Sequence, residues 1–299
     1  MKEYITRFCE EYHYPVQAVQ TLTDTYEAAM KSPSLRALFD EAREAYALSP
    51  DLDYLRYLNA LKTACTESSL SWESISLLFY ICLVPQLAAY YAQRQLPEAL
   101  CRASLEDLKW KLQECRQVYG LWGSFVPDWF AGFFRLTRFT LGRLQFELTS
   151  FPKNYVQCGR TKPEGMEHAI NIHIPSSGPL LHEDCLHSYR LAADFFRSAF
   201  PGKKTAFICY SWLLYPEHYK FLPSHSRILD FMADFDIYDT DPDPAGGDLW
   251  RIFGLADCSD TAKLPEKTSL QQAYKKWLLN GNPPGTGTGL FFLNGESLP

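Results

Sequence analysis

The segment from residue 170 to residue 214 restricts the fold of this chain more than any other stretch. It begins with INIHI, in which isoleucine alternates with polar residues at the period of a half-buried β-strand. The loop PSSGPLL follows, and after it comes an apolar stripe at helical spacing, made of Leu186, Tyr189, Ala193, Phe196 and Phe200. The last part, TAFICYSWLL, is apolar on both faces, as a central strand covered on two sides would be.

This order predicts a strand, a loop, a helix and a second strand parallel to the first. The loop and the start of the helix would aim free backbone N–H groups at whatever lies there, and an anion suits that position. Residues 175–181 are therefore the first place to expect a ligand. Glu183 and Asp184 stand in the first turn of the helix, which they stabilise.

Length and composition indicate an ordered globular protein. A chain of 299 residues can bury a large core and form two domains. The net charge of −6 and the lack of a basic stripe argue against a nucleic-acid partner. The longest apolar run, residues 75–84, is about half of the roughly 20 residues that span a bilayer, so we expect no membrane partner.

The cysteines and the start of the chain bear on its location. Nine cysteines are scattered without a CxxC pair or a Cys/His cluster, which favours free thiols and no metal site. The segment MKEYITRFCEEYHYP carries acidic residues where a signal peptide needs an apolar region. We therefore expect a cytoplasmic protein.

Residues 1–123 are expected to form a helical N-terminal domain. Ser32 and Ser49 precede prolines at the start of apolar stripes, as helix N-caps do, and Ser104 with Asp107 has the spacing of a capping box. No cluster of charged residues there indicates catalysis, so a cap or lid is the natural interpretation.

Residues 124–299 are expected to form a second domain that contains the sheet. LGRLQFELTSF reads as a strand whose polar face carries Arg143, Gln145 and Glu147. FDIYDT and LWRIFG flank the turn-rich DPDPAGGD, which predicts an antiparallel hairpin. Thr268 and Gln271 form a capping box, and GTGTGLFFL is interpreted as a flexible approach to a last strand.

The segments LGRLQFE, IHIP, SYRLAADFF, CYSWLLYP and SRILDF resemble a bacterial family of acyltransferase domain-containing proteins with a GNAT-like (N-acetyltransferase-like) C-terminal domain. The resemblance implies an α/β (α+β) fold, with a helical N-terminal domain before a mixed β-sheet domain. It also implies an enzyme that transfers an acyl group, such as acetyl, from acyl-CoA to an amine. In this fold the strand before the long helix binds pantetheine and the next loop cradles the pyrophosphate. The corresponding residues here are His173, Ile174, Ser176, Ser177 and Gly178.

Direct attack of an amine on a thioester needs a general base for the amine proton and an acid for the leaving thiolate. His173 and Glu147 are the candidate bases, and Tyr215 and Tyr219 are the candidate acids. Each has a purely structural alternative, because histidines on a strand face are often only hydrogen-bonded and tyrosines near Trp212 are often only packed. The acceptor would be a small molecule or a peptide that carries an amine.

Two other interpretations stay open. Cys209 or Ser211 could act as a covalent nucleophile with His218 or His225, although a mid-strand position argues against it. The loop PSSGPLLHED also departs from the family pattern, because it has one glycine, two prolines without N–H groups and an acidic pair. That departure favours a catalytically inactive, GNAT-shaped module that binds a partner.

Overall fold

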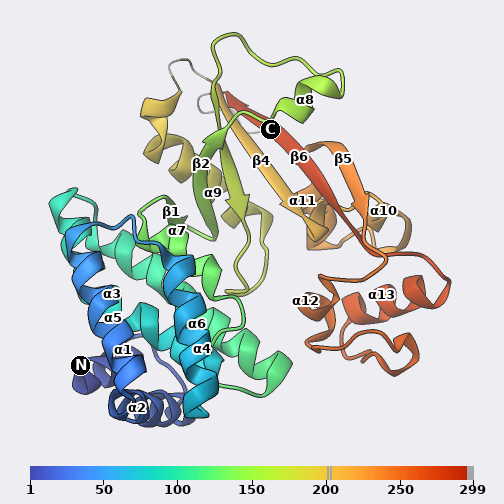
Figure 1. Ribbon diagram of the computed structural model, residues 1–299. Helices are drawn as coiled ribbons and strands as arrows, with labels where there is room; N and C mark the ends of the chain where they lie inside the picture. The colour runs from blue at the N-terminus through green and yellow to red at the C-terminus, as the bar shows by residue number, and fades with distance from the viewer. Residues whose placement is uncertain (201, 203, 295–299) are drawn as a thin grey trace. The chain divides into compact units, whose positions relative to one another are not determined.

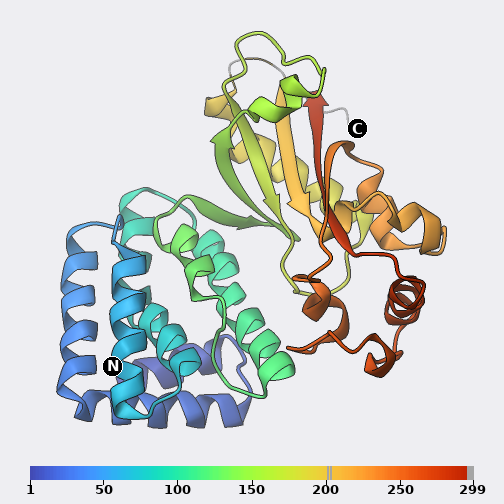
Figure 2. The same ribbon diagram turned by 45° about the vertical axis from the view of Figure 1, so that its right-hand side comes forward.

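The computed structural model describes residues 1–200, 202 and 204–294, and its contacts divide the chain into two compact units (Figures 1 and 2). The first unit spans Met1–Phe139 and the second begins at Thr140. Residues 124–139, which the sequence grouped with the second domain, belong to the first unit. The reason is aromatic packing, since the rings of Phe130 and Phe134 lie about 5 Å from the ring of Tyr80.

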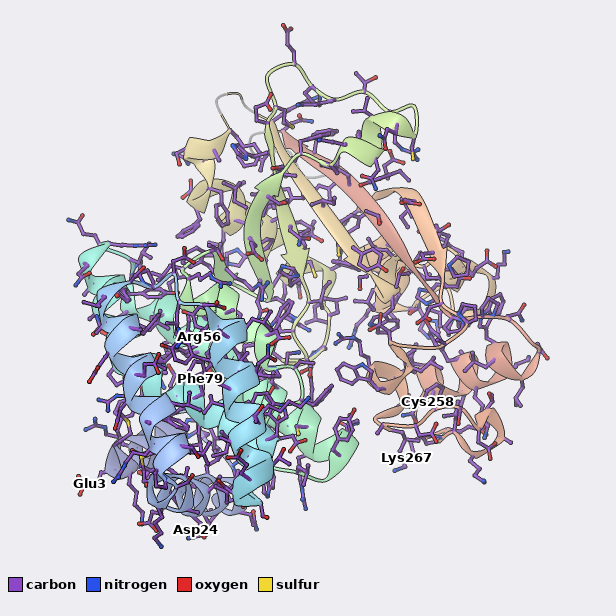
Figure 3. All side chains as sticks on the ribbon, viewed as in Figure 1. Glu3, Asp24, Arg56, Phe79, Cys258 and Lys267 are labelled. Carbon is purple, nitrogen blue, oxygen red and sulfur yellow. The ribbon has the colours of Figure 1, made fainter. Side chains whose placement is uncertain are left out.

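From Lys2 to Phe134 the regular structure of the first unit is helical. The helices are α1 (Lys2–Glu11), α2 (Val16–Lys31), α3 (Pro33–Leu48), α4 (Tyr54–Ser68), α5 (Trp72–Gln93), α6 (Glu98–Tyr119), the 3₁₀ helix η1 (Pro127–Phe130) and α7 (Ala131–Phe134). Helix α5 contacts each of α1 to α4, α6 and η1. It is therefore the core of this unit, and Figure 3 shows its Phe79 inside the bundle.

Helix α5 is the one helix in the described part of the chain that is long and apolar enough to cross a membrane. Its most apolar window is 72% buried inside the protein, which is the pattern of a core helix. Pro85 lies within this helix rather than at its end. The helix therefore continues for nine residues past the apolar run of residues 75–84, as far as Gln93.

The predicted helix starts are partly confirmed. The Ser32 hydroxyl accepts a hydrogen bond from the Leu35 amide and caps α3. Ser49 caps no helix, because α4 begins later and is capped by Asp53. The capping box at Ser104 and Asp107 is wrong, since both residues lie inside α6 and are buried. The Asp107 carboxylate instead accepts the indole N–H of Trp129 at 2.9 Å.

The second unit contains a six-stranded mixed sheet in the order β1-β2-β3-β4-β6-β5. Its strands are β1 (Arg138–Leu141), β2 (Leu144–Ser150), β3 (His168–His173), β4 (Lys204–Ser211), β5 (Asp236–Pro242) and β6 (Gly285–Asn294). Strands β3 and β4 are parallel, and the pairs β2–β3, β4–β6 and β5–β6 are antiparallel. The parallel pair is joined by α9 (His182–Phe195) and η2 (Arg197–Ala199), as predicted.

The two faces of the sheet differ. Phe146, Ile170, Ile172, Phe207 and Phe291 point to the face covered by α9 and α11 (Arg227–Met232), which we call the α9 face. On the second face, α8 (Lys153–Gln157) and its flanking loop cover the end of the sheet where β3 begins, and they pack against Ala169, Ala206 and Leu290. Figure 2 shows α8 and α9 on opposite sides of the sheet.

The predicted hairpin of FDIYDT and LWRIFG is wrong. The first segment forms β5, but LWRIF forms the short helix α12 (Leu249–Phe253), and the partner of β5 is β6. Residues 243–284 thus form an insertion between two paired strands, with η4 (Thr261–Lys263) and α13 (Ser269–Leu279). Cys258 and Lys267, labelled in Figure 3, belong to it. Thr268 is confirmed as the N-cap of α13, since the Gln271 amide donates to its hydroxyl at 3.2 Å, but the Gln271 side chain accepts the Lys267 amide at 2.8 Å and not the Thr268 amide of a capping box.

The glycines of GTGTG are part of β6 and not a flexible approach to it. Gly285, Gly287 and Gly289 lie on the α9 face, where a Cβ on each would overlap Tyr215, the Leu214 carbonyl group and Phe235, respectively. Those residues belong to the segment after β4, which comprises η3 (Trp212–Leu214) and α10 (His218–Phe221), and to the residues after α11. The glycine stripe therefore lets these elements contact the backbone of β6 directly.

We predict that Gly287→Ala destabilises the protein by roughly 2–4 kcal/mol, because an alanine Cβ would lie 2.1 Å from the Leu214 carbonyl oxygen, which is backbone and cannot swing away. The free energy of unfolding in urea measures the effect. Gly202→Ala is the matched control, since a Cβ there meets nothing within 4 Å. Equal stability of the two variants would contradict the packing described here.

Candidate functional site

Strands β3 and β4 separate at the centre of the sheet. They pair only at Ile170–Phe207 and Asn171–Ile208. Past these pairs β3 continues with β2, through Ile172 and His173, while β4 stays paired with β6 as far as Ser211. The carboxyl-terminal residues of the two parallel strands are therefore not paired with each other, and the sheet opens between them.

A cluster of three polar side chains lies on the second face of the sheet, at the end of β3. The Nε2 atom of His173 is 3.6 Å from the Glu147 carboxylate and 3.4 Å from the Asn171 side-chain amide. The exposed fractions of the His173 and Glu147 side chains are 17% and 27%, so both are partly shielded yet reachable by water. The structure thus brings together the two predicted bases, and it adds Asn171, whose position in INIHIP already placed it on the same face as His173.

The loop after β3 holds the other predicted contact residues. Ile174 packs partly against the core of the α9 face, and Pro175 is buried. Ser176 and Gly178 are exposed, and Ser177 is half-buried. Gly178 has a φ of +123°, which favours glycine, and a Cβ there would project into open space.

Arg143 ties this loop to the turn between β1 and β2. Its guanidinium donates through Nε to the Pro179 carbonyl at 3.0 Å and through its two terminal nitrogens to the Pro175 and Gly178 carbonyls at 2.9 Å each. Burial lowers the pKa of Arg143, but a guanidinium remains charged at neutral pH. Sequence analysis placed Arg143 on a strand face and missed this role, although Gly142, at a φ of +70°, was the signal for a turn.

A histidine and an aspartate meet at the start of α9. The His182 Nε2 atom lies 2.8 Å from the Asp234 carboxylate, which also accepts the Tyr189 hydroxyl at 3.2 Å. The Asp234 side chain is only 6% exposed, and burial raises its pKa. No sequence pattern pointed to this pair, because the two residues are 52 positions apart.

The two predicted acids, Tyr215 and Tyr219, lie in the segment that follows η3. Tyr215 is buried against Gly285 and the ring of His218, and burial raises its pKa. Tyr219 is 56% exposed. The role of the two tyrosines as acids stays a prediction.

The residues of the alternative covalent mechanism are poorly placed for it. Cys209 is fully buried in β4, and burial raises the pKa of its thiol, which keeps it in the unreactive protonated form. The Ser211 hydroxyl accepts the Leu213 amide and caps η3. His218 bonds to the Tyr274 hydroxyl, and His225 is exposed on a loop. No pair of nucleophile and base forms among these four.

A small hollow lies where the insertion meets η3 and the start of β6. Its lining includes Trp212, Tyr274 and the carboxylate-bearing Asp243 and Asp248. Both carboxylates already have partners, because Asp243 accepts the amides of Gly246 and Gly247 and Asp248 pairs with Arg251. The described residues include no group of three or more metal-ligating side chains.

Comparisons with known families confirm the two-part organisation. Residues 138–291 match the family model for a GNAT-like C-terminal domain, and residues 3–136 match that for an N-acyltransferase N-terminal domain. Among curated proteins, no sequence matches this chain.

Solved acyltransferase structures share the fold. A mutant acyltransferase in complex with octanoyl-CoA has a TM-score of 0.76 at 22% identity and covers 99% of this chain and 88% of its own. An acyltransferase in complex with decanoyl-CoA has a TM-score of 0.74 at 23% identity, with 98% and 87% covered. One in complex with decanoyl-CoA and teicoplanin has a TM-score of 0.72 at 21% identity, with 96% and 87% covered. These likenesses confirm the predicted α+β fold.

His218 makes stability depend on pH. It is fully buried, and burial lowers its pKa from 6.5 to about 4, so the folded state favours the neutral ring. The neutral His218 ring therefore contributes to the free energy of unfolding fully above pH 6.5. This stabilisation, of up to about 3 kcal/mol, is lost as the pH falls from 6.5 towards 4. We expect His218→Gln to flatten the dependence of the unfolding free energy on pH between 7 and 4. The exposed-site control, His225→Gln, should keep the wild-type slope, and an unchanged slope in His218→Gln would refute the assignment.

Proposed function

The chain belongs to the family that carries a GNAT-like C-terminal domain, and we propose that it transfers an acyl group from an acyl-CoA thioester to an amine. The separation of β3 from β4 after Asn171 and Ile208 is the observation that supports this proposal. At the ends where β3 and β4 separate, the backbone N–H and C=O groups of one strand do not bond to those of the other. The pantetheine arm of CoA carries two amides, which can pair with such groups as an added strand would.

The loop and the start of α9 are proposed to hold the phosphates of CoA. Ser176, Ser177 and Gly178 lie in this loop, and the first turn of α9 presents backbone N–H groups, which suit an anion. Glu183 and Asp184 are exposed in the same turn and oppose an anion there. The positive charge of Arg143, which bonds to the loop, offsets part of that repulsion.

The proposed reaction is direct transfer. The amine nitrogen forms a bond to the thioester carbonyl carbon, and the carbon–sulfur bond then breaks as the tetrahedral intermediate collapses. His173 accepts the proton that the attacking amine loses, with Asn171 and Glu147 orienting its ring. The thiolate leaves and takes up a proton, for which Tyr215 and Tyr219 stay the candidate donors.

The structural neighbours bear on the acyl group and the acceptor. Those proteins were solved with octanoyl-CoA and decanoyl-CoA, which supports a donor with a medium-length chain, with acetyl-CoA as the alternative. One neighbour was solved with teicoplanin, which supports a small-molecule acceptor, with a peptide amine as the alternative.

The cytoplasmic location stays a prediction. All nine cysteines are free thiols.

Calorimetry with acetyl-, octanoyl- and decanoyl-CoA tests the proposal. We expect saturable binding of at least one donor and an affinity about tenfold or more lower in Gly178→Val, because the new side chain projects into the proposed phosphate position. Gly159→Val is the matched control, since Gly159 also has a positive φ, of +81°, and open space around it. If the wild-type protein binds no acyl-CoA, the proposal fails and the inactive binding module takes its place.

We predict that His173→Gln lowers kcat by about 10²–10⁴-fold, the usual contribution of a general base, and leaves the affinity for acyl-CoA unchanged. Release of CoA thiol in the presence of an amine acceptor measures the rate. His168→Gln, at the other end of the same strand, is the control and should retain wild-type activity. Full activity of His173→Gln would remove His173 as the base and leave Glu147.

A further inference from the structure

One arginine organises the loop that follows β3. The three donor nitrogens of Arg143 each bond to a different carbonyl, and these carbonyls belong to Pro175 at the start of the loop and to Gly178 and Pro179 near its end. A single side chain thus joins both arms of the loop. The planar, rigid fork of a guanidinium can make such a set of contacts, whereas a lysine ammonium cannot reproduce its geometry.

Arg143 is itself held in place by α9. Its backbone amide donates to the Ser188 hydroxyl at 2.8 Å, and that hydroxyl donates to the Asp184 carbonyl at 2.7 Å. The preceding Gly142 packs so closely that a Cβ would lie 2.6 Å from the Ser188 oxygen. The β1–β2 turn, the loop and the first turns of α9 are therefore linked by hydrogen bonds.

These bonds fix the direction of the loop amides. In a trans peptide the N–H points opposite to the C=O, so carbonyls that face the guanidinium turn the next N–H away from it. The carbonyls of Pro175 and Pro179 accept from Arg143, and the amides of Ser176 and Leu180 therefore point outward. Neither amide donates to an acceptor within residues 1–200, 202 and 204–294.

Arg143 also brings positive charge to the loop. Its recorded side-chain acceptors are the neutral carbonyls of the loop. The exposed carboxylates of Glu183 and Asp184 lie in the adjoining turn of α9, and that of Asp184 interacts electrostatically with the guanidinium. The two outward N–H groups are donors that a phosphate group can accept from, and the guanidinium lies on the other side of the same peptides.

From this geometry we infer that Arg143 is a positioning residue: it holds the 175–180 loop in the conformation that binds the phosphates of CoA. The inference rests on the proposed function, because it presupposes that CoA binds at this loop. It assigns the recognition of phosphate, but not of pantetheine, to Arg143.

The test compares two ligands that differ in their phosphates. Calorimetry measures the affinities of CoA and of pantetheine, which lacks the phosphates and the nucleoside, for the wild type, Arg143→Ala and the control Arg190→Ala, an exposed arginine on α9. We expect Arg143→Ala to weaken CoA binding by about tenfold or more and to reduce the preference for CoA over pantetheine by the same factor. Arg190→Ala should match the wild type.

The outcomes separate the two proposals. Failure of the wild type to bind CoA would remove the proposed function. Binding of CoA by the wild type with an equal preference in Arg143→Ala would overturn the inference alone. If Arg143→Ala does not fold, Arg143→Lys keeps the charge but not the fork, and it should bind CoA more weakly while its affinity for pantetheine stays unchanged; a wild-type affinity for CoA would overturn the inference.

Discussion

Strand β4 pairs with β6 along its whole length, but it shares only two residue pairs with β3. Because each strand at the centre of the sheet is held more firmly by its outer neighbour, the seam between β3 and β4 is the place where the sheet opens. His173 ends β3 at this seam, with Glu147 of β2 3.6 Å from its ring, and the loop that carries Ser176 to Gly178 follows. The proposed donor site depends on this one interruption in the backbone ladder.

Packing on the α9 face explains why β4 stays with β6. The rings of Phe207 and Phe291, on adjacent strands, stack with centroids 4.9 Å apart. The glycines of β6 then allow Leu214, Tyr215 and Phe235 to contact the strand directly. Side chains at those glycine positions would push this layer away from the sheet. The glycines thus serve packing next to the site.

The sequence of the loop after β3 and of the helix start that follows it is unfavourable for binding an anion, and contacts from another turn compensate for this. Prolines remove donors, and Glu183 and Asp184 add negative charge where a phosphate would lie. The guanidinium of Arg143 orients the remaining amides and contributes the opposite charge. A loop that departs from the family pattern can therefore still present an anion-binding surface, because the donor directions are set by a residue from another turn.

Local sequence was enough for the strand, loop, helix and parallel strand between residues 170 and 214, for the helical N-terminal part, and for the polar faces of the two separate strands that carry Glu147 and His173. Periodicity encodes these features because each depends on neighbours along the chain. The partner of β5, the packing role of the β6 glycines, the contacts of Arg143 and the Asp234–His182 pair were decided by tertiary structure. Each joins residues from separate elements, and alternation along one segment carries no information about which distant segment it will meet.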